Sequence, residues 1–332
     1  MLSVERLEVS RGAAGERLDR YLAAQFPALS RTRLAALIQQ GCVRVGGECA
    51  RPSRRVAPGE LVEVRIVPRE PLSALPVPIP LEILYEDDDV VVINKPAGMT
   101  VHPGAGTPAD APTLAGALLH RYGALSEQGG AIRPGIVHRL DKGTSGAIVV
   151  ARNDAAHRSL AAQFAARSIE KTYLALVHGK MKESAGSIRL PVARDLRRRT
   201  RMTTRRRPES GRASHTDWRA LAAIGPFTLV EAALRTGRTH QIRVHFSALG
   251  HPVVGDALYG APKNPVFAGK SLPALGRNFL HAARLAFAHP RTGLRVEVRA
   301  PLPPELRRFL DSLAAAAGIP CARIDAALQG YL

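Results

Sequence analysis

The 332-residue chain is long enough for about two domains, and its composition (45% hydrophobic, 23% charged) excludes a fibrous or wholly disordered protein. It has no apolar run of about 18 residues and no secretory h-region, which predicts a cytoplasmic protein that does not enter membranes. Lys and Arg exceed Asp and Glu by 47 to 28, a net charge of +19 that favours nucleic acid as partner, and three scattered cysteines exclude a disulfide framework or zinc site.

The first 67 residues predict a small α+β module. Its helices and strands are expected over residues 18–26, 30–40, 42–45 and 61–66, because apolar residues recur there at helical or alternating spacing. Gly46-Gly47, directly after the first strand, is a hairpin signal.

The second predicted helix offers an anion site at its N-terminus. Ser30 is the expected N-cap, because a hydroxyl in that position accepts a hydrogen bond from the first turn. Helix N-termini carry partial positive charge, and Arg31 and Arg33 would add to it. We therefore expect Ser30, Arg31 and Arg33 to bind phosphate.

Five prolines between residues 68 and 80 predict an extended linker. The main domain is expected over residues 81–313, followed by a C-terminal tail over 314–332. Its strands are predicted at residues 90–93, 147–151, 171–177, 214–218 and 227–235, with helices capped by Asn153 or Asp154 and by Thr239. Because strands and helices alternate irregularly, the predicted fold class is α+β with a mixed, largely antiparallel sheet.

The densest polar constellation is His-Arg-Leu-Asp-Lys-Gly-Thr-Ser-Gly at residues 138–146, just before a predicted strand. Its glycines and hydroxyls indicate a tight loop in which the backbone can approach a ligand. Arg139 and Lys142 flank Asp141, and cationic neighbours favour an ionised carboxylate that can act as nucleophile or general base. The alternative is a purely structural Asx-turn or capping aspartate.

A second constellation, residues 235–245, places Arg238, His240 and Arg243 at the start of a predicted helix. Positive groups there repel the helix dipole, so we expect either phosphate or a carboxylate such as Asp141 to offset them. The alternative is exposed arginines without a partner. A metal site is disfavoured, because His240 and His245, five residues apart, point to different sides of a helix or strand.

Two further features are consistent with an RNA partner. Tyr173 lies on a predicted strand, where it is either a core residue or a stacking platform for a base. Residues 194–212 carry nine arginines against two acidic residues, a net charge of +7. Such a segment is either a solvated loop or an arm that becomes ordered on RNA.

Four blocks of this sequence resemble, in order, the signature blocks of the RluA-type RNA pseudouridine synthase family. They are NKPAGM at 94–99, HRLDKGTSG at 138–146, EKTYLALVHG at 170–179 and LRTGRTHQIRVHFSALGHPVVGDALYG at 234–260. Residues 16–47 are similar to the RNA-binding module that the family shares with a protein of the small ribosomal subunit. The resemblance covers nearly the whole chain.

The resemblance implies an isomerase that acts on uridine in RNA without cofactor or metal. The bond from the sugar to a ring nitrogen breaks, the base rotates, and a ring carbon bonds the sugar instead. By the same match, Asp141 is the catalytic carboxylate, Tyr173 stacks on the target base, and Arg243 pairs with Asp141. Arg139 helps to hold the place of the flipped nucleotide, and Lys142, Thr144, Arg238 and His240 are further substrate-binding candidates.

The expected partner is large-subunit ribosomal RNA or a pre-ribosomal particle, bound by a monomer. The terminal module and the arginine-rich segment look most like the D-type enzymes of the family, with the C-type enzymes as the close alternative. Two other functions are weighed against this one. The chain is alternatively a non-catalytic rRNA-binding or ribosome-assembly protein, or an aspartyl-phosphate-type hydrolase, because Asp141-Lys142-Gly143-Thr144 loosely matches the nucleophile loop of such enzymes.

Overall fold

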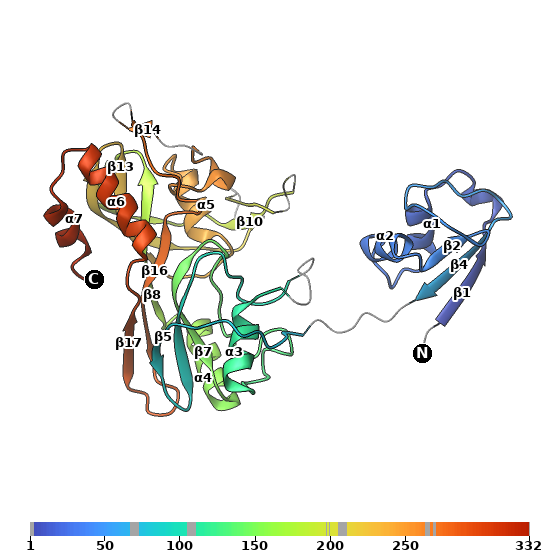
Figure 1. The fold of residues 1–332 in the computed structure, drawn as a ribbon, viewed down its shortest axis with the longest axis horizontal. Helices are drawn as coiled ribbons and strands as arrows, with labels where there is room; N and C mark the ends of the chain where they lie inside the picture. Colours follow the sequence, from blue (N-terminus) through green and yellow to red (C-terminus); the bar gives the residue numbers. More distant parts are fainter. Residues whose placement is uncertain are drawn as a thin grey trace. The chain divides into compact units, whose positions relative to one another are not determined.

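The computed structural model describes residues 3–66, 73–104, 111–196, 198, 200–204, 211–262, 266–267 and 270–331. The chain forms two compact units, Met1–Pro71 and Leu72–Leu332 (Figure 1). In the part of the chain that is described, every helix is too short or too polar to cross a membrane. Much of the predicted arginine-rich arm, including Arg197, Arg199 and residues 205–210, lies outside the described residues.

The first unit is a four-stranded antiparallel sheet, ordered β1-β4-β2-β3, with two helices. Its elements are β1 (Ser3–Glu8), η1 (Arg11–Ala13), α1 (Leu18–Gln25), α2 (Arg31–Gln39), β2 (Val43–Val45), β3 (Glu48–Cys49) and β4 (Leu61–Ile66). Both helices and the Gly46-Gly47 hairpin agree with the prediction. The strand β1 was not predicted, because this edge strand has no clear alternation of buried and exposed residues.

The second unit is built on a mixed sheet with the strand order β5-β6-β7-β16-β8-β13-β12-β9, with β17 paired to β16. These strands are β5 (Ile83–Glu86), β6 (Val90–Lys95), β7 (Ser145–Ala151), β8 (Glu170–His178), β9 (Ala185–Ile188), β12 (Thr216–Ile224), β13 (Phe227–Leu234), β16 (Leu280–Ala288) and β17 (Arg295–Arg299). Neighbours pair antiparallel except for β7 and β16, which run parallel. The predicted fold class is therefore confirmed.

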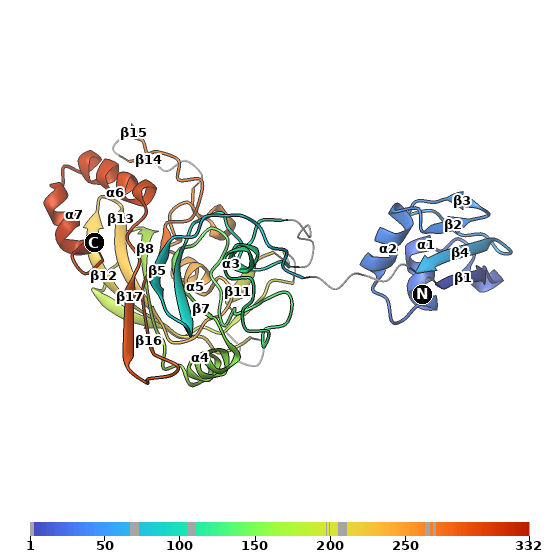
Figure 2. The same cartoon turned by 60° about the horizontal axis from the view of Figure 1, so that its bottom comes forward.

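Helices cover both faces of this sheet. They are α3 (Leu114–Tyr122), α4 (Asp154–Ala166), α5 (Gln241–Ala248), α6 (Pro304–Ala316) and α7 (Cys321–Leu328), with the short η3 (Ala257–Tyr259). Two small ladders, β10 (Val192–Arg194) with β11 (Met202–Thr204) and β14 (Val266–Phe267) with β15 (Lys270–Ser271), complete the described elements. On β12, Trp218 packs against Phe246 of α5, while α7 contacts the same strand beside α6 (Figure 2).

Two predicted boundaries are wrong. Residues 73–80, assigned to the linker, belong to the second unit, because Ala74 N–H donates to Ala131 and Val77 N–H donates to Gly116. The expected tail is not a tail: α6 continues to Ala316, and α7 follows with Ile324 and Leu328 fully buried in the main core. Apolar burial of this kind attaches the end of the chain to the sheet.

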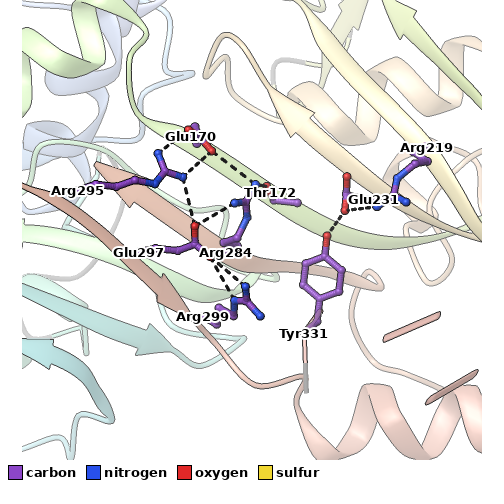
Figure 3. A network of polar contacts seen from close by, with 9 residues as sticks. All are labelled: Glu170, Thr172, Arg219, Glu231, Arg284, Arg295, Glu297, Arg299 and Tyr331. Atoms are coloured by element: carbon purple, nitrogen blue, oxygen red, sulfur yellow. Dashed lines mark hydrogen bonds and ion pairs between the residues drawn. The ribbon is translucent and has the colours of Figure 1, made fainter. Parts of the chain in front are cut away.

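The C-terminus is also attached by polar contacts. Tyr331 donates a hydrogen bond to Glu231, which also accepts from Arg219 at 3.0 Å (Figure 3). Beside them, Arg284 donates to Thr172 at 3.3 Å on the same face of the sheet. The hydrogen bonds of Tyr331 and Arg219 to Glu231 therefore attach the segment after α7 to β12 and β13.

A third correction concerns the start of α5. Thr239 is not its N-cap, because the helix begins at Gln241 and the cap position is occupied by His240 in a left-handed conformation (φ 56°). Gln241 itself binds the preceding turn, since its Oε1 accepts from Arg238 N–H at 3.0 Å and from Thr236 Oγ1 at 2.7 Å. The glutamine side chain thus fixes the turn before α5, and the described helix start has no side-chain cap.

The stability of the second unit should fall in mild acid, because His245 and His281 are buried and His138 is partly buried. Burial lowers their pKa values to about 3, 4 and 4, against about 6.5 in an unfolded chain. Between the folded-state pKa values and 6.5, the unfolded state therefore binds more protons than the folded state. The stability that the neutral histidines contribute is complete above pH 6.5 and is lost as the pH falls toward 4. We expect the free energy of unfolding to drop by roughly 1–2 kcal/mol per histidine between pH 7.5 and pH 5.

Urea unfolding at pH 7.5 and pH 5 tests this expectation. The one tryptophan of the chain, Trp218, is buried in the second unit, so its fluorescence reports on that unit. His281→Asn should reduce the pH dependence by about the contribution of one histidine. Equal stability of the wild type at the two pH values would show that these histidines do not resist protonation.

Candidate active site

A cavity of about 390 Å³ opens at the start of β7, and its volume is within the range of small-molecule sites. Three segments line it: the loop before β7, the junction of α4 with β8, and the connection from β13 into α5. Its polar lining residues include Arg139, Asp141, Thr144, Arg167, Lys171, Tyr173, Arg235, Arg238, His240 and Arg243. Among the described lining residues, Asp141 is the one carboxylate, so an otherwise cationic wall surrounds it.

A glycine places the Asp141 loop beside β8. Gly146 has a φ of +114°, and a Cβ there would lie 2.2 Å from the carbonyl oxygen of Ala282. Any other residue would push β7 away from β16. Ala282 pairs with Gly146 on one side and with Tyr173 on the other, so this close approach brings Asp141 and Tyr173 to one cavity.

Arg243 on α5 holds two carboxylates at once. Its Nη1 donates to Asp141 Oδ2 at 3.1 Å, the pairing that the resemblance implies, and Nε and Nη2 donate to Asp256 at 2.6 and 2.9 Å. Burial would lower the pKa of Arg243, but the carboxylates of Asp256 and Asp141 raise it on balance, so the guanidinium stays charged. Of the two anions expected here, phosphate or carboxylate, the structure thus has carboxylates to offset the positive charge at the start of α5.

A second contact to Asp141 comes from His240, whose Nε2 lies 4.0 Å from Asp141 Oδ2. On its other side, His240 Nδ1 is 2.9 Å from the hydroxyl of Tyr259, which accepts a hydrogen bond from Met202 N–H. Burial raises the pKa of Tyr259 to about 12, and burial lowers that of His240. A protonated phenol facing Nδ1 favours the imidazole tautomer with its proton on Nε2, toward Asp141.

Tyr173 and Thr144 give the cavity a ring and a hydroxyl. The Tyr173 side chain is 6% exposed, and burial raises its pKa, so it remains a neutral phenol. Thr144 lies in the same loop as Asp141, and its N–H donates to the Asp141 carbonyl at 3.0 Å. Its Oγ1 is buried without a hydrogen-bond partner in the structure, a state that a ligand can relieve.

Lys95 supports the loop that carries Asp141. Its Nζ is fully buried and donates to the carbonyls of Pro96 and Met99 at 2.7 and 3.0 Å. Within that turn, Gly98 N–H donates to the carbonyl of Lys142 at 2.7 Å. Burial lowers the pKa of Lys95 to about 7. The NKPAGM block therefore fixes the loop position through the backbone of Lys142, which is exposed and is not among the residues that line the cavity.

The predicted phosphate site of the first unit differs in part from expectation. Ser30 is the N-cap of α2 and accepts from Arg33 N–H at 3.3 Å, as predicted. Arg31, however, donates from Nε and Nη2 to Asp19 at 3.1 and 2.9 Å, so an intramolecular carboxylate occupies its guanidinium. These residues belong to the first unit, and the residues that line the cavity belong to the second.

Two contributors to the site were missed by sequence reasoning. Asp256 lies in the last of the four blocks, but no periodicity connects it to Arg243, 13 residues earlier. The one available signal was that it is a lone carboxylate in a basic block. Arg167 at the end of α4 lines the cavity, although its sequence position indicated only a helix terminus.

Comparisons with known proteins find relatives over most of the chain. The family model for RNA pseudouridylate synthase matches residues 89–248, and the S4 domain model matches residues 16–62. An uncharacterized RNA pseudouridine synthase of Chloroflexus aurantiacus is 47% identical over 307 residues, 90% of each chain. The ribosomal large subunit pseudouridine synthase D of Xanthomonas campestris is 44% identical over 316 residues, 94% of this chain and 93% of the relative.

A solved structure is similar as well. Human RNA pseudouridylate synthase domain containing 1 is 33% identical and matches with a TM-score of 0.52, over 75% of this chain and 90% of that one. The family model and the relatives cover the residues that form the cavity, which confirms the resemblance found in the sequence. The chain therefore belongs to the RNA pseudouridine synthase family and is an isomerase that forms pseudouridine in RNA.

Proposed function

We propose that this enzyme isomerises specific uridines of large-subunit ribosomal RNA, with Asp141 as the catalytic carboxylate acting on an extruded base. The observation that carries the proposal is the position of Asp141 as the lone described carboxylate of a cationic cavity, with its Oδ2 held by Arg243. Such a cavity attracts an RNA strand and presents one oriented oxygen to it. We propose that the enzyme works as a cytoplasmic monomer without metal or cofactor.

The proposed reaction conserves all atoms of the nucleotide. The bond between N1 and the sugar C1′ breaks, the uracil rotates, and C5 bonds C1′. The proton of C5 is then lost, while N1 gains one. Because reactant and product are isomers, no oxidant, reductant or group donor is consumed, and the protein's task is to orient the base and to hold Asp141 in place.

The cavity residues divide this task. Extruding a uridine from folded RNA costs roughly a few kcal/mol of stacking and pairing, which binding inside the cavity must offset. Tyr173 offers a ring face on which the base stacks, and Arg139, exposed at the cavity, takes the place of the base in the RNA. Thr144 Oγ1 is placed to hydrogen-bond the nucleotide, and Arg243 keeps Asp141 oriented.

Several observations support ribosomal RNA as the substrate. The net charge of +19 favours a long polyanion. The S4 domain at residues 16–62 is an RNA-binding module. Relatives named ribosomal large subunit pseudouridine synthase D, from Xanthomonas, Xylella and Zymomonas, are 42–44% identical over most of both chains. We therefore favour the D-type specificity over the C-type.

The experiment is a reaction of the purified enzyme with full-length transcripts carrying uridine tritiated at C5, since isomerisation releases that tritium into water. The large-subunit rRNA transcript should release it to the extent of a few uridines per molecule. A small-subunit rRNA transcript and a tRNA pool, at equal uridine concentration, are the matched controls. Release from the controls that equals or exceeds release from the large-subunit transcript would refute the proposed substrate.

A further inference from the structure

Three arginines gather at the edge of the catalytic cavity. Arg167 and Arg238 both line it, from the end of α4 and from the connection before α5. Arg212 lies next to them, because Arg238 Nε donates to the carbonyl of the following residue, Ala213, at 3.2 Å. Arg212 is itself fixed by a backbone bridge with Val192, in which each N–H donates to the other carbonyl at 2.9 Å.

These arginines repel one another without compensation. Burial lowers the pKa of Arg238, and the charges of Arg212 and Arg167 lower it further, so both of these cations lie close enough to act on Arg238. Across the described residues, no carboxylate forms an ion pair with any of the three. A cluster of this kind costs stability unless an anion joins it.

On the opposite face of the sheet, neighbouring arginines are each paired with a glutamate. Arg295 donates to both carboxylate oxygens of Glu170, at 2.7 and 3.1 Å, and Arg284 and Arg299 bind Glu297 at 3.2 and 3.1 Å (Figure 3). Arg295 and Arg299 are exposed and Arg284 is partly buried, yet each has a glutamate. Among the described residues, the three arginines at the rim of the cavity have no such glutamate or aspartate.

Arg167 also occupies a backbone position that disfavours it. It ends α4 with φ 60° and ψ 29°, the left-handed conformation in which its N–H caps the carbonyls of Gln163 and Phe164. Glycine is the usual residue at this point of a helix, because a Cβ strains the left-handed region. An arginine in a strained position beside two like charges indicates that its guanidinium serves a ligand.

We propose that Arg167, Arg212 and Arg238 bind a backbone phosphate of the RNA next to the extruded uridine. This inference rests on the proposed function, because it names a subsite for the same substrate. The sugar joins the base to its phosphates by a few bonds, so a base inside the cavity leaves a phosphate at the rim. A guanidinium offers paired N–H groups that match phosphate oxygens, and the anion would neutralise the mutual repulsion of the three cations.

Substitution of Arg167 by glycine tests the subsite, because it removes the cation and relieves the backbone strain together. We expect Arg167→Gly to fold at least as stably as the wild type, to bind a large-subunit rRNA transcript roughly fivefold more weakly at ~0.1 M salt, and to reduce the slope of log Kd against log salt by about 1. In turnover assays KM should rise and kcat should change little.

Two variants complete the design. Arg167→Lys keeps the charge and should retain the wild-type salt slope, while Arg158→Gln, an exposed arginine of α4 outside the cavity, should bind RNA as the wild type does. Wild-type affinity and slope in Arg167→Gly would overturn the subsite. So would a glycine variant that is less stable than the wild type and binds RNA equally well, because Arg167 would then be structural.

The binding assay also separates this inference from the proposed function. If the wild type forms no pseudouridine in large-subunit rRNA but Arg167→Gly still flattens the salt slope, the substrate assignment fails and the phosphate subsite stands. If the wild type is active and the slope is unchanged in Arg167→Gly, the subsite fails and the proposed function stands.

Discussion

Asp141→Asn is expected to lower pseudouridine formation by at least about 10³-fold, while RNA affinity stays within a few-fold of the wild type. The amide has nearly the shape of the carboxylate and still offers an oxygen to Arg243 Nη1, so the cavity keeps its form. What is lost is the negative charge and the basicity of the oxygen. Asp256 continues to hold Arg243, which protects the fold of the variant.

Tritium release under single-turnover conditions measures the chemical step of Asp141→Asn directly, and filter binding gives its RNA affinity. Asp311→Asn is the matched control, because Asp311 is a carboxylate paired with Arg307 on α6, outside the cavity. This control should react at the wild-type rate. Turnover by Asp141→Asn within tenfold of the wild type would remove Asp141 from the chemistry.

The second large effect is expected for Asp256→Asn. The Asp256 side chain is 2% exposed and accepts two hydrogen bonds from Arg243, so its loss leaves that guanidinium with Asp141 as its remaining described carboxylate. Removing one partner of a buried ion pair costs about 3 kcal/mol or more. We also expect kcat to fall about 10²-fold, because Arg243 no longer fixes the angle of the Asp141 carboxylate.

A comparison at one temperature separates these two consequences of the Asp256 substitution. Turnover is measured well below the unfolding midpoint of the variant, where circular dichroism shows both proteins folded. Asp256→Glu restores the negative charge on a side chain that is one methylene longer, and it should recover part of kcat. A folded Asp256→Asn enzyme with the wild-type kcat would show that Asp256 supports only stability and does not position Arg243.

Strong local signals accounted for much of the fold. Asn153 accepts from Ala156 N–H at 2.9 Å at the start of α4, and the apolar run at 147–151 is β7, buried throughout. Elements with weaker signals were missed, such as α7, whose buried face becomes clear only against the sheet. The predicted end of the domain at residue 313 falls inside α6, although Pro304 in the first turn of α6 is a typical signal for the start of a helix.

The site was predictable where residue chemistry and motif coincided. Asp141, Tyr173 and Arg243 came from three separate blocks, and the structure gathers them in one cavity. Contributions that depend on tertiary geometry were not predictable. The reach of Asp256 to Arg243 depends on how the chain turns after α5, and the exposure of Arg167 to the cavity depends on the packing of α4 against the sheet.

The central claim is that this enzyme forms pseudouridine in large-subunit rRNA through Asp141. Its most direct test is a map of pseudouridines in the rRNA of a strain that lacks the protein, complemented with the wild type or with Asp141→Asn. We predict that specific large-subunit pseudouridines disappear in the deletion strain, return with the wild type and stay absent with Asp141→Asn. An unchanged large-subunit map in the deletion strain, or restoration of the sites by Asp141→Asn, would contradict the claim.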